Sequence, residues 1–235
     1  MSTLLLRLAA PMQGWGVDTF ERRGTERIPT KSGVVGLLAS ALGRRRNESI
    51  DDLTKLRFGV RVDREGTLLR DFHTARSQKS AYVTIRYYLS DAVFLVGLEG
   101  NKAFLYEIEY ALRHPVFPLY LGRRSCPPEG KLSLGVREDK TLLQALQEEP
   151  WLVSNYIKMK EDTEVRLRII TDADSQSAGW HIQHDLPLSF DQSHRQYGFR
   201  RVSETDSIII INPKSQDFIT EESTNHDPML ELGEG

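Results

Sequence analysis

TLLLRLA at residues 3–9 and GVVGLLASALG at residues 33–43 decide the fold class of this 235-residue chain. The first stretch is mostly aliphatic and is stopped by Pro11, a pattern typical of a buried strand. The second combines apolar and small residues between a possible N-cap at Ser32 and Gly43, which predicts a helix. We therefore expect an α+β domain that begins with a strand and a helix.

Two glycines inside the predicted helix, Gly33 and Gly36, need a physical reason. Each costs about 1 kcal/mol in helix propensity relative to Ala. A glycine allows another part of the chain, or a ligand, to come close to the helix backbone. We therefore expect this helix to pack closely against a sheet or a ligand.

Strand and helix signals continue to alternate up to about residue 125. We expect strands at 57–63 and 67–74 joined by a turn at Glu65-Gly66, a strand at 91–98, a helix at 101–113 capped by Asn101, and a strand at 117–121. This order resembles the split βαβ, or ferredoxin-like, arrangement with an elaborated middle.

The remaining sequence is less regular. It suggests a helix at 139–148 and strands at 164–171, 178–190, 195–202 and 207–211. From Pro213 the chain is acidic and polar, which predicts a mobile tail. The expected division is a core over 1–127, a smaller β-rich C-terminal region over 128–212, and a tail over 213–235.

Composition excludes several protein classes. Hydrophobic residues make up 39% of the chain, enough for a core, but no apolar run approaches the roughly 20 residues of a membrane span. The N-terminus has no basic region and Arg7 interrupts its short apolar run, so it is not predicted to be a signal peptide. A single cysteine, Cys126, excludes an internal disulfide framework and a zinc knuckle. We expect a cytoplasmic protein with no membrane partner.

Charge is divided unevenly along the chain. The net charge is only −2, but residues 1–137 carry 22 Lys+Arg against 14 Asp+Glu, a balance of +8. The remaining residues carry 9 against 19, a balance of −10. This asymmetry favours a basic working face in the first half, although an uneven scatter of solvated charges would give the same numbers.

Three segments combine the residue types that bind single-stranded nucleic acid. GRRSCP at residues 122–127 places two arginines next to a glycine, as in a phosphate clamp or an ordinary surface loop. PMQGWG at 11–16 could form a stacking shelf, or Trp15 could pack under the sheet. Residues 76–88 interleave cations with tyrosines, either as a nucleic-acid surface or as a plain exposed hairpin; the cations are Arg76, Lys79 and Arg86.

His73 is the one general-base candidate in the basic half. It stands close to Asp71, Lys79 and Tyr82 in the sequence, although a histidine in a strand such as RDFHT is more often structural. The other histidines show no metal-ligand spacing, and no phosphate loop, dinucleotide fingerprint or nucleophile elbow is present. The sequence therefore predicts no catalytic residue, no metal and no cofactor.

Five motifs occur in an order that identifies a family. They are RLAAPMQGWG (7–16), PTKSGVVGLLASALG (29–43), LRDFHT (69–74), RYYLSDAVF (86–94) and YLGRRSCP (120–127). Together they resemble the CasD family, the RAMP-type subunits of the type I-E CRISPR complex Cascade. The likeness covers most of residues 4–127 and is loose beyond residue 137.

The resemblance implies a ferredoxin-like (RRM-like) RAMP core with a β-hairpin thumb at 76–88 and a smaller β-rich C-terminal part. It also implies a non-catalytic subunit, present once per complex, that grips the 5′ handle of the CRISPR guide RNA. Such a subunit caps a filament of CasC backbone subunits, touches the large subunit CasA and meets target DNA through the complex.

The resemblance also implies positions for the RNA contacts. Near the handle it places Met12, Gln13, Trp15, Lys31, Arg123 and Arg124. On the thumb it places the three cations of 76–88, with Arg86 best positioned. In this subtype a different subunit, CasE, cuts the precursor RNA.

Two other functions stay open on the sequence alone. Related RAMP subunits of type I-C systems are metal-independent endoribonucleases, and His73 with Lys79 and Tyr82 could serve such a reaction. A structural protein that binds no RNA is also conceivable, but it leaves the charge asymmetry unexplained.

Overall fold

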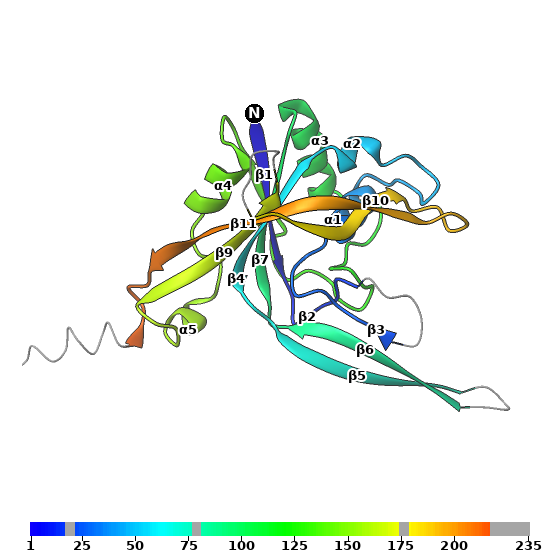
Figure 1. The fold of residues 1–235 in the computed structure, drawn as a ribbon, viewed down its shortest axis with the longest axis horizontal. Coiled ribbons are helices and arrows are strands. Elements are labelled where there is room, and N and C mark those ends of the chain that lie inside the picture. Colours follow the sequence, from blue (N-terminus) through cyan, green and yellow to red (C-terminus); the bar gives the residue numbers. More distant parts are fainter. Residues whose placement is uncertain (17–21, 77–80, 174–178, 217–235) are drawn as a thin grey trace, which may run out of the picture.

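The computed structural model describes residues 1–16, 22–76, 81–173 and 179–216. Its centre is a seven-stranded antiparallel sheet in the order β10-β11-β9-β4-β7-β1-β8 (Figure 1). The strands are β1 (Ser2–Ala9), β4 (Arg57–Arg64), β7 (Val93–Gly100), β8 (Ser133–Arg137), β9 (Glu164–Asp172), β10 (His181–Ser189) and β11 (Gln196–Ile211). The expected α+β class is confirmed, and the structure shows that it is built around a large antiparallel sheet.

Helices cover both faces of this sheet. Alternate residues of β1 point to opposite sides, so that Leu4 and Leu6 join one apolar cluster and Leu5 another. The first cluster lies under α1 (Lys31–Ala41), α2 (Asp51–Thr54) and α3 (Lys102–Arg113). The second lies under α4 (Leu142–Glu148), and α5 (Asn155–Lys158) follows it in the chain.

Thr30, rather than the expected Ser32, caps α1. Its hydroxyl accepts a hydrogen bond from the Gly33 amide, and the helix begins at Lys31. The expected cap at Asn101 is confirmed, because its side chain accepts from the amides of Ala103 and Phe104 at the start of α3.

The four strands β4-β7-β1-β8 are connected through α1 and α3 in the chain order strand, helix, strand, strand, helix, strand. The strand expected at 117–121 was wrong, and β8 takes the fourth position. Residues 116 and 117 donate instead to the carbonyls of Ala41 and Ser40, at the end of α1. Pro118 has no amide hydrogen to donate to a sheet.

The C-terminal strands extend the same sheet. β9 pairs with β4 at Val60↔Ile170, and β11 pairs with β9. The strands expected at 195–202 and 207–211 are one long strand, β11, with a register shift between Thr205 and Ile208. The division at residue 127 stays a prediction, and the described strands on both sides of it share one sheet. Most of the predicted tail, 217–235, lies outside the described residues.

A long hairpin projects from one end of the molecule (Figure 1). It consists of β5 (Thr67–Arg76) and β6 (Ala81–Ser90), paired from Thr67↔Ser90 to Arg76↔Ala81. The expected pairing of 57–63 with 67–74 was wrong, because β4 pairs with β7 and β9 while β5 leaves the main sheet. The short strands β2 (Met12–Gln13) and β3 (Arg22–Arg23) flank β6 at the base.

Candidate nucleic-acid interface

A cavity of about 260 Å³ lies along α1, where two glycine-containing loops and the β10–β11 turn meet it. Four arginines and several aromatic rings line it, and its described lining contains no aspartate or glutamate. The arginines and aromatic residues of its wall are Trp15, Tyr120, Phe190, Tyr197, Arg44, Arg45, Arg46 and Arg195. We call this cavity the α1 pocket. Guanidinium groups without opposing carboxylates are suited to bind phosphate.

Close backbone contacts build the floor of the α1 pocket. Gly122 has φ +78°, and a Cβ added there would lie 1.9 Å from the carbonyl oxygen of Gly14. At Gly33 an added Cβ would lie 2.8 Å from the Trp15 ring. The expected close packing at Gly33 is therefore confirmed, but its partner is the loop that carries Trp15, not a sheet or a ligand as expected.

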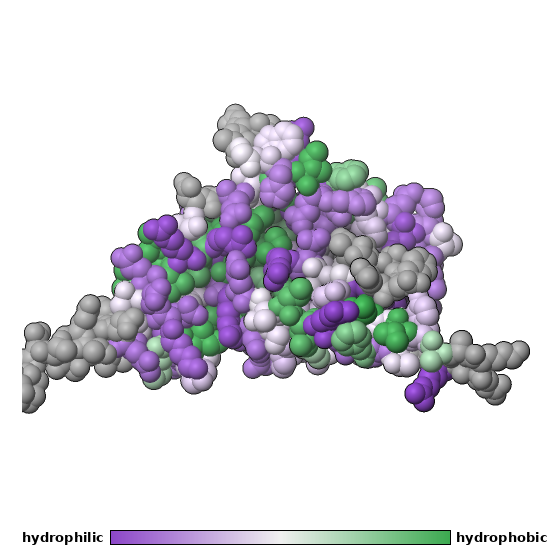
Figure 2. Space-filling model, turned by 60° about the horizontal axis from the view of Figure 1, so that its bottom comes forward, coloured by the Kyte–Doolittle hydropathy of each residue, from purple (hydrophilic) through white to green (hydrophobic). Residues whose placement is uncertain are grey.

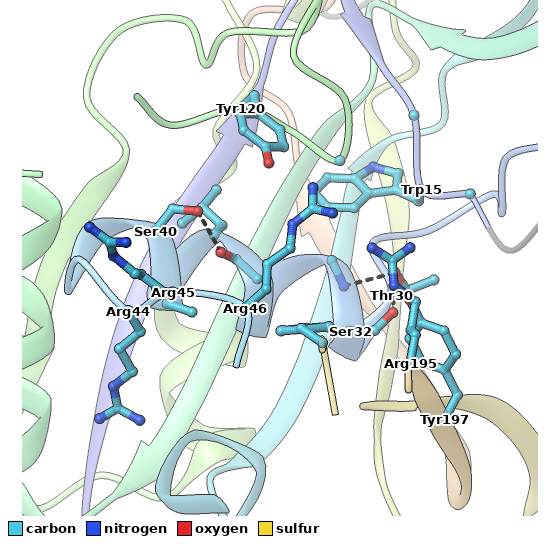
Figure 3. A pocket seen from close by; sticks show the side chains of 18 residues that line it. Trp15, Thr30, Ser32, Ser40, Arg44, Arg45, Arg46, Tyr120, Arg195 and Tyr197 are labelled. Carbon is cyan, nitrogen blue, oxygen red and sulfur yellow. Dashed lines mark hydrogen bonds between the residues drawn. The ribbon is translucent and has the colours of Figure 1, made fainter. Parts of the chain in front are cut away.

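The four arginines differ in where their charges point. Figure 3 shows Arg46 extending toward Tyr120 and Trp15, while Arg195 lies beside Tyr197 across the pocket. Arg44 points away from the pocket and pairs with the Asp52 carboxylate. The hydrogen bond that Arg44 donates lowers the pKa of Asp52. Arg46 and Arg195 therefore supply the charge that is directed at a ligand.

Three residues expected near RNA lie mainly in the interior. Trp15 is buried, and its indole Nε1 donates to Gln13 Oε1 at 3.1 Å. The buried amide of Gln13 donates to the carbonyls of Ala92 and Leu8 at 2.8 Å and 3.3 Å. Met12 is partly buried and packs against the core. The structure therefore favours packing under the sheet for Trp15, which presents only part of its ring to the α1 pocket.

Lys31 belongs to a buried ionic cluster. Its Nζ lies 2.9 Å from Asp172, and its backbone amide donates to Asp185 at 2.8 Å. Arg200 contacts both carboxylates, at 2.7 Å from Asp172 and 2.6 Å from Asp185. The Lys31 charge is thus neutralised within the protein, and the residue joins the first turn of α1 to β9 through its side chain and to β10 through its amide.

Arg123 and Arg124 have different environments. The Arg123 guanidinium donates to the carbonyls of Tyr87, Arg23 and Gly24 at 2.9, 3.0 and 2.7 Å, and it lies over the Tyr88 ring. Arg124 is exposed to solvent. Of the predicted pair, only Arg124 is available to a ligand through its whole side chain.

The hairpin carries the other predicted cations. Arg76 is exposed at the end of β5, Lys79 lies outside the described residues, and Arg86 is half-buried near Tyr88. Burial tends to raise the pKa of Tyr88, but hydrogen bonds from Ser125, Arg123 and Arg86 outweigh it and lower that pKa. Arg86 and Arg123, both predicted to contact RNA, are thus brought together beside Tyr88 at the base of the hairpin.

The general-base candidate His73 stands on the exposed part of β5. Its Nε2 contacts the Asp71 carboxylate. Within the described ranges no cluster of three His, Cys, Asp or Glu could hold a metal ion. No described helix has the length and apolar character needed to cross a bilayer.

Reasoning from the sequence missed the charged wall of the α1 pocket. Arg44, Arg45 and Arg46 were visible as a run of three cations after the predicted helix, but such a run is equally typical of a solvated helix end. Arg195 and Tyr197 come from a segment far away in the sequence. Only the sheet order, which brings the β10–β11 turn to α1, connects them to the run.

Three comparisons with known proteins agree. The profile of the CRISPR-associated protein (Cas_Cas5) family matches residues 3–203. The CRISPR system Cascade subunit CasD of Escherichia coli (strain K12) is 40% identical over 158 residues, which are 57% of this chain and 70% of the relative.

Two solved structures share the fold over nearly the whole length. A crystal structure of a Cas protein is 39% identical and covers 91% of this chain and 97% of its own, with a TM-score of 0.69. A chain of a CRISPR RNA-guided surveillance complex is 32% identical and covers 94% and 98%, with a TM-score of 0.74.

Proposed function

Since this chain belongs to the Cas5/CasD family of CRISPR-associated proteins, we propose that it is a non-catalytic, RNA-binding subunit of a type I-E Cascade surveillance complex. One observation carries the proposal: the α1 pocket gathers four arginines and four aromatic rings with no carboxylate in its described lining. This combination suits a single-stranded nucleic acid, because cations bind the backbone and rings stack on unpaired bases.

The RNA in this proposal is the guide RNA, held by its 5′ handle. Arg46 and Arg195 contact phosphates from two sides of the α1 pocket, and Tyr120 and Tyr197 lie against bases or sugars. Arg124 extends the positive surface beyond the pocket.

The fold supports the same assignment. We infer that β1, α1, β4, β7, α3 and β8 form the ferredoxin-like RAMP core, whose strand order they follow. The β5–β6 hairpin is the thumb, longer than the 76–88 expected from the sequence. Figure 2 shows hydrophobic residues along this projection, which suits contact with a neighbouring subunit. In the complex the chain caps the CasC filament, touches CasA and meets target DNA indirectly.

Arg46→Ala and Arg195→Ala, each in the complex co-expressed with its other subunits and a guide RNA, test this function. The matched control is Arg166→Ala, which removes an exposed arginine from β9. We expect each pocket variant to reduce guide RNA per assembled complex by about tenfold, the loss of one or two charge-assisted contacts. Guide occupancy equal to that of the control in both pocket variants would overturn the proposal.

A further inference from the structure

The β10–β11 ribbon presents an apolar face that no described part of the chain covers. Trp180, Ile182 and Phe199 are 43%, 61% and 68% exposed. Ile182 pairs directly with Arg201, and Phe199 stands two residues before Arg201. Ile182, Phe199 and Arg201 therefore project from the same face of the ribbon. We call Trp180, Ile182, His184, Phe199 and Arg201 the ribbon face.

The side chains of the ribbon face are arranged in ordered contacts. The Arg201 guanidinium lies over the Trp180 ring at 4.6 Å, and His184 stacks on Phe199 with centroids 4.5 Å apart and planes at 28°. Rings that already pack against one another lose little conformational freedom when a partner binds. The surface is thus preorganised for binding.

The opposite face of the ribbon fixes its position. Arg200 is buried and bonded to Asp185 and Asp172, and Asp185 also accepts the amide of Lys31 in α1. A shift of the strand register by one residue would exchange the two faces of the ribbon. It would expose the ionic cluster, bury the apolar face and break every pairing between β10 and β11. The apolar residues are therefore held outward by the fold.

The charges around the ribbon face favour a protein partner over RNA. The groove beside it, with a volume of about 430 Å³, is lined by Ile182 and His184 and by charges of both signs: Glu26, Glu204, Arg27 and Arg168. Arg168 is paired with Glu204. The described charged residues that line the α1 pocket are, by contrast, all arginines, of which Arg44 is paired with a carboxylate. An apolar centre with a rim of mixed charge is typical of a protein interface, whereas RNA favours a uniformly basic rim.

The edge strand argues for contact through side chains. β10 is the outermost strand, so its outer backbone groups could in principle pair with a partner strand. Pro187 and two register shifts interrupt it, at Gln183/Leu186 and at Pro187/Ser189. Such interruptions disfavour strand addition.

We propose that the ribbon face is the docking surface for another protein subunit of the complex, whose contact patch is apolar with flanking charges of both signs. This inference rests on the proposed function and adds where a protein partner binds. Because the β10–β11 turn also lines the α1 pocket through Arg195 and Tyr197, the docked subunit stands next to the RNA.

Site-specific photocross-linking on the assembled complex tests the proposal. A benzophenone amino acid replaces Phe199, and in the control it replaces Tyr156, which is 66% exposed on α5. After irradiation, mass spectrometry identifies the cross-linked molecule. We expect a cross-link from position 199 to another protein subunit. A cross-link from 199 to guide RNA, or none above the Tyr156 control, overturns the proposal.

Phe199→Asp supplies an independent measurement. Its side chain is exposed, so the variant should keep the melting temperature of the parent chain within about 1 °C. We expect its affinity for the otherwise complete assembly to fall by about 30-fold, as for an aromatic interface anchor. Unchanged affinity contradicts docking at this face. Guide-RNA occupancy of the Arg46→Ala complex reports separately on the α1 pocket, so failure of one claim is distinguishable from failure of the other.

Discussion

Arg123 and Arg124 are adjacent in the sequence but differ in their contacts. Arg123 bonds three backbone carbonyls and covers Tyr88, whereas Arg124 is exposed. Arg123→Ala should lower the free energy of unfolding by about 2 kcal/mol, because three backbone carbonyls, two of them in part-buried hydrogen bonds, lose a charged donor. Arg124→Ala should leave it unchanged within about 0.5 kcal/mol. Urea unfolding of the two variants checks this, and equal stabilities would contradict the structural role of Arg123.

Gly122 is constrained by its backbone conformation and by the close approach of Gly14. Its positive φ and the 1.9 Å approach of an added Cβ to Gly14 leave no room for a side chain. Gly122→Ala should cost more than about 2 kcal/mol of stability, from the left-handed backbone plus the clash. Gly179 is the matched control, since its φ is +68° and an added Cβ meets nothing within 4 Å.

Gly179→Ala should therefore cost only about 1 kcal/mol, the price of the backbone conformation alone. Thermal unfolding of both variants gives the comparison. A Gly122 variant no less stable than the Gly179 variant would mean that the two loops do not touch as described.

His73 distinguishes a binding subunit from a nuclease. Its imidazole contacts Asp71 on the exposed part of the hairpin, away from the arginines that line the α1 pocket. Labelled repeat RNA incubated with the purified protein in EDTA at about pH 7–8 should remain uncut, because His73 lies apart from the pocket that would hold the RNA. Specific cleavage within the repeat that His73→Ala abolishes would establish the endoribonuclease alternative.

Helices and most strands could be predicted from local patterns, because capping residues and apolar periodicity are local. Asn101 correctly predicted the start of α3, and the aliphatic run at 3–9 correctly predicted β1. Pairing partners could not be predicted in the same way. The turn at Glu65-Gly66 looks like a hairpin turn, yet β5 pairs with β6 because β4 is needed between β7 and β9.

The candidate site was predicted only in part for the same reason. Cations and rings close together in the sequence were found, including Arg124 and Arg86. Their burial was not visible, so Lys31 and Arg123 were taken as ligand contacts although ion pairs and carbonyls hold them. Arg195 and Tyr197 reach the α1 pocket only through the sheet order, which no local pattern encodes.

The β10–β11 ribbon is held to α1 by the buried cluster of Lys31, Asp172, Asp185 and Arg200. Asp185→Ala should lower the free energy of unfolding by about 3–5 kcal/mol, because Arg200 is left buried without one of its partners. As a control, Glu65→Ala removes an exposed partner of Arg168 and should cost less than about 1 kcal/mol. Denaturant unfolding checks both, and equal losses would contradict the anchoring of the ribbon.

At the scale of the whole molecule, the two halves of the chain combine at one site. The basic first half supplies α1 and its arginine run, and the acidic second half supplies Arg195 and the carboxylates that hold the ribbon beside it. Net charge is near neutral, so the isolated chain should bind RNA weakly and with strong salt dependence. We expect assembly with other subunits to determine how firmly the guide is held.

Cross-linking of the guide RNA itself tests the central claim most directly. The complex is assembled with a guide carrying 4-thiouridine at single positions of its 5′ handle, irradiated and digested, and the RNA-bound peptides are identified by mass spectrometry. We predict that the cross-linked peptides contain the residues of the α1 pocket, namely the run from Arg44 to Arg46, Tyr120, or the segment from Arg195 to Tyr197. Handle cross-links confined to other surfaces of this chain, or to other subunits alone, would contradict the account.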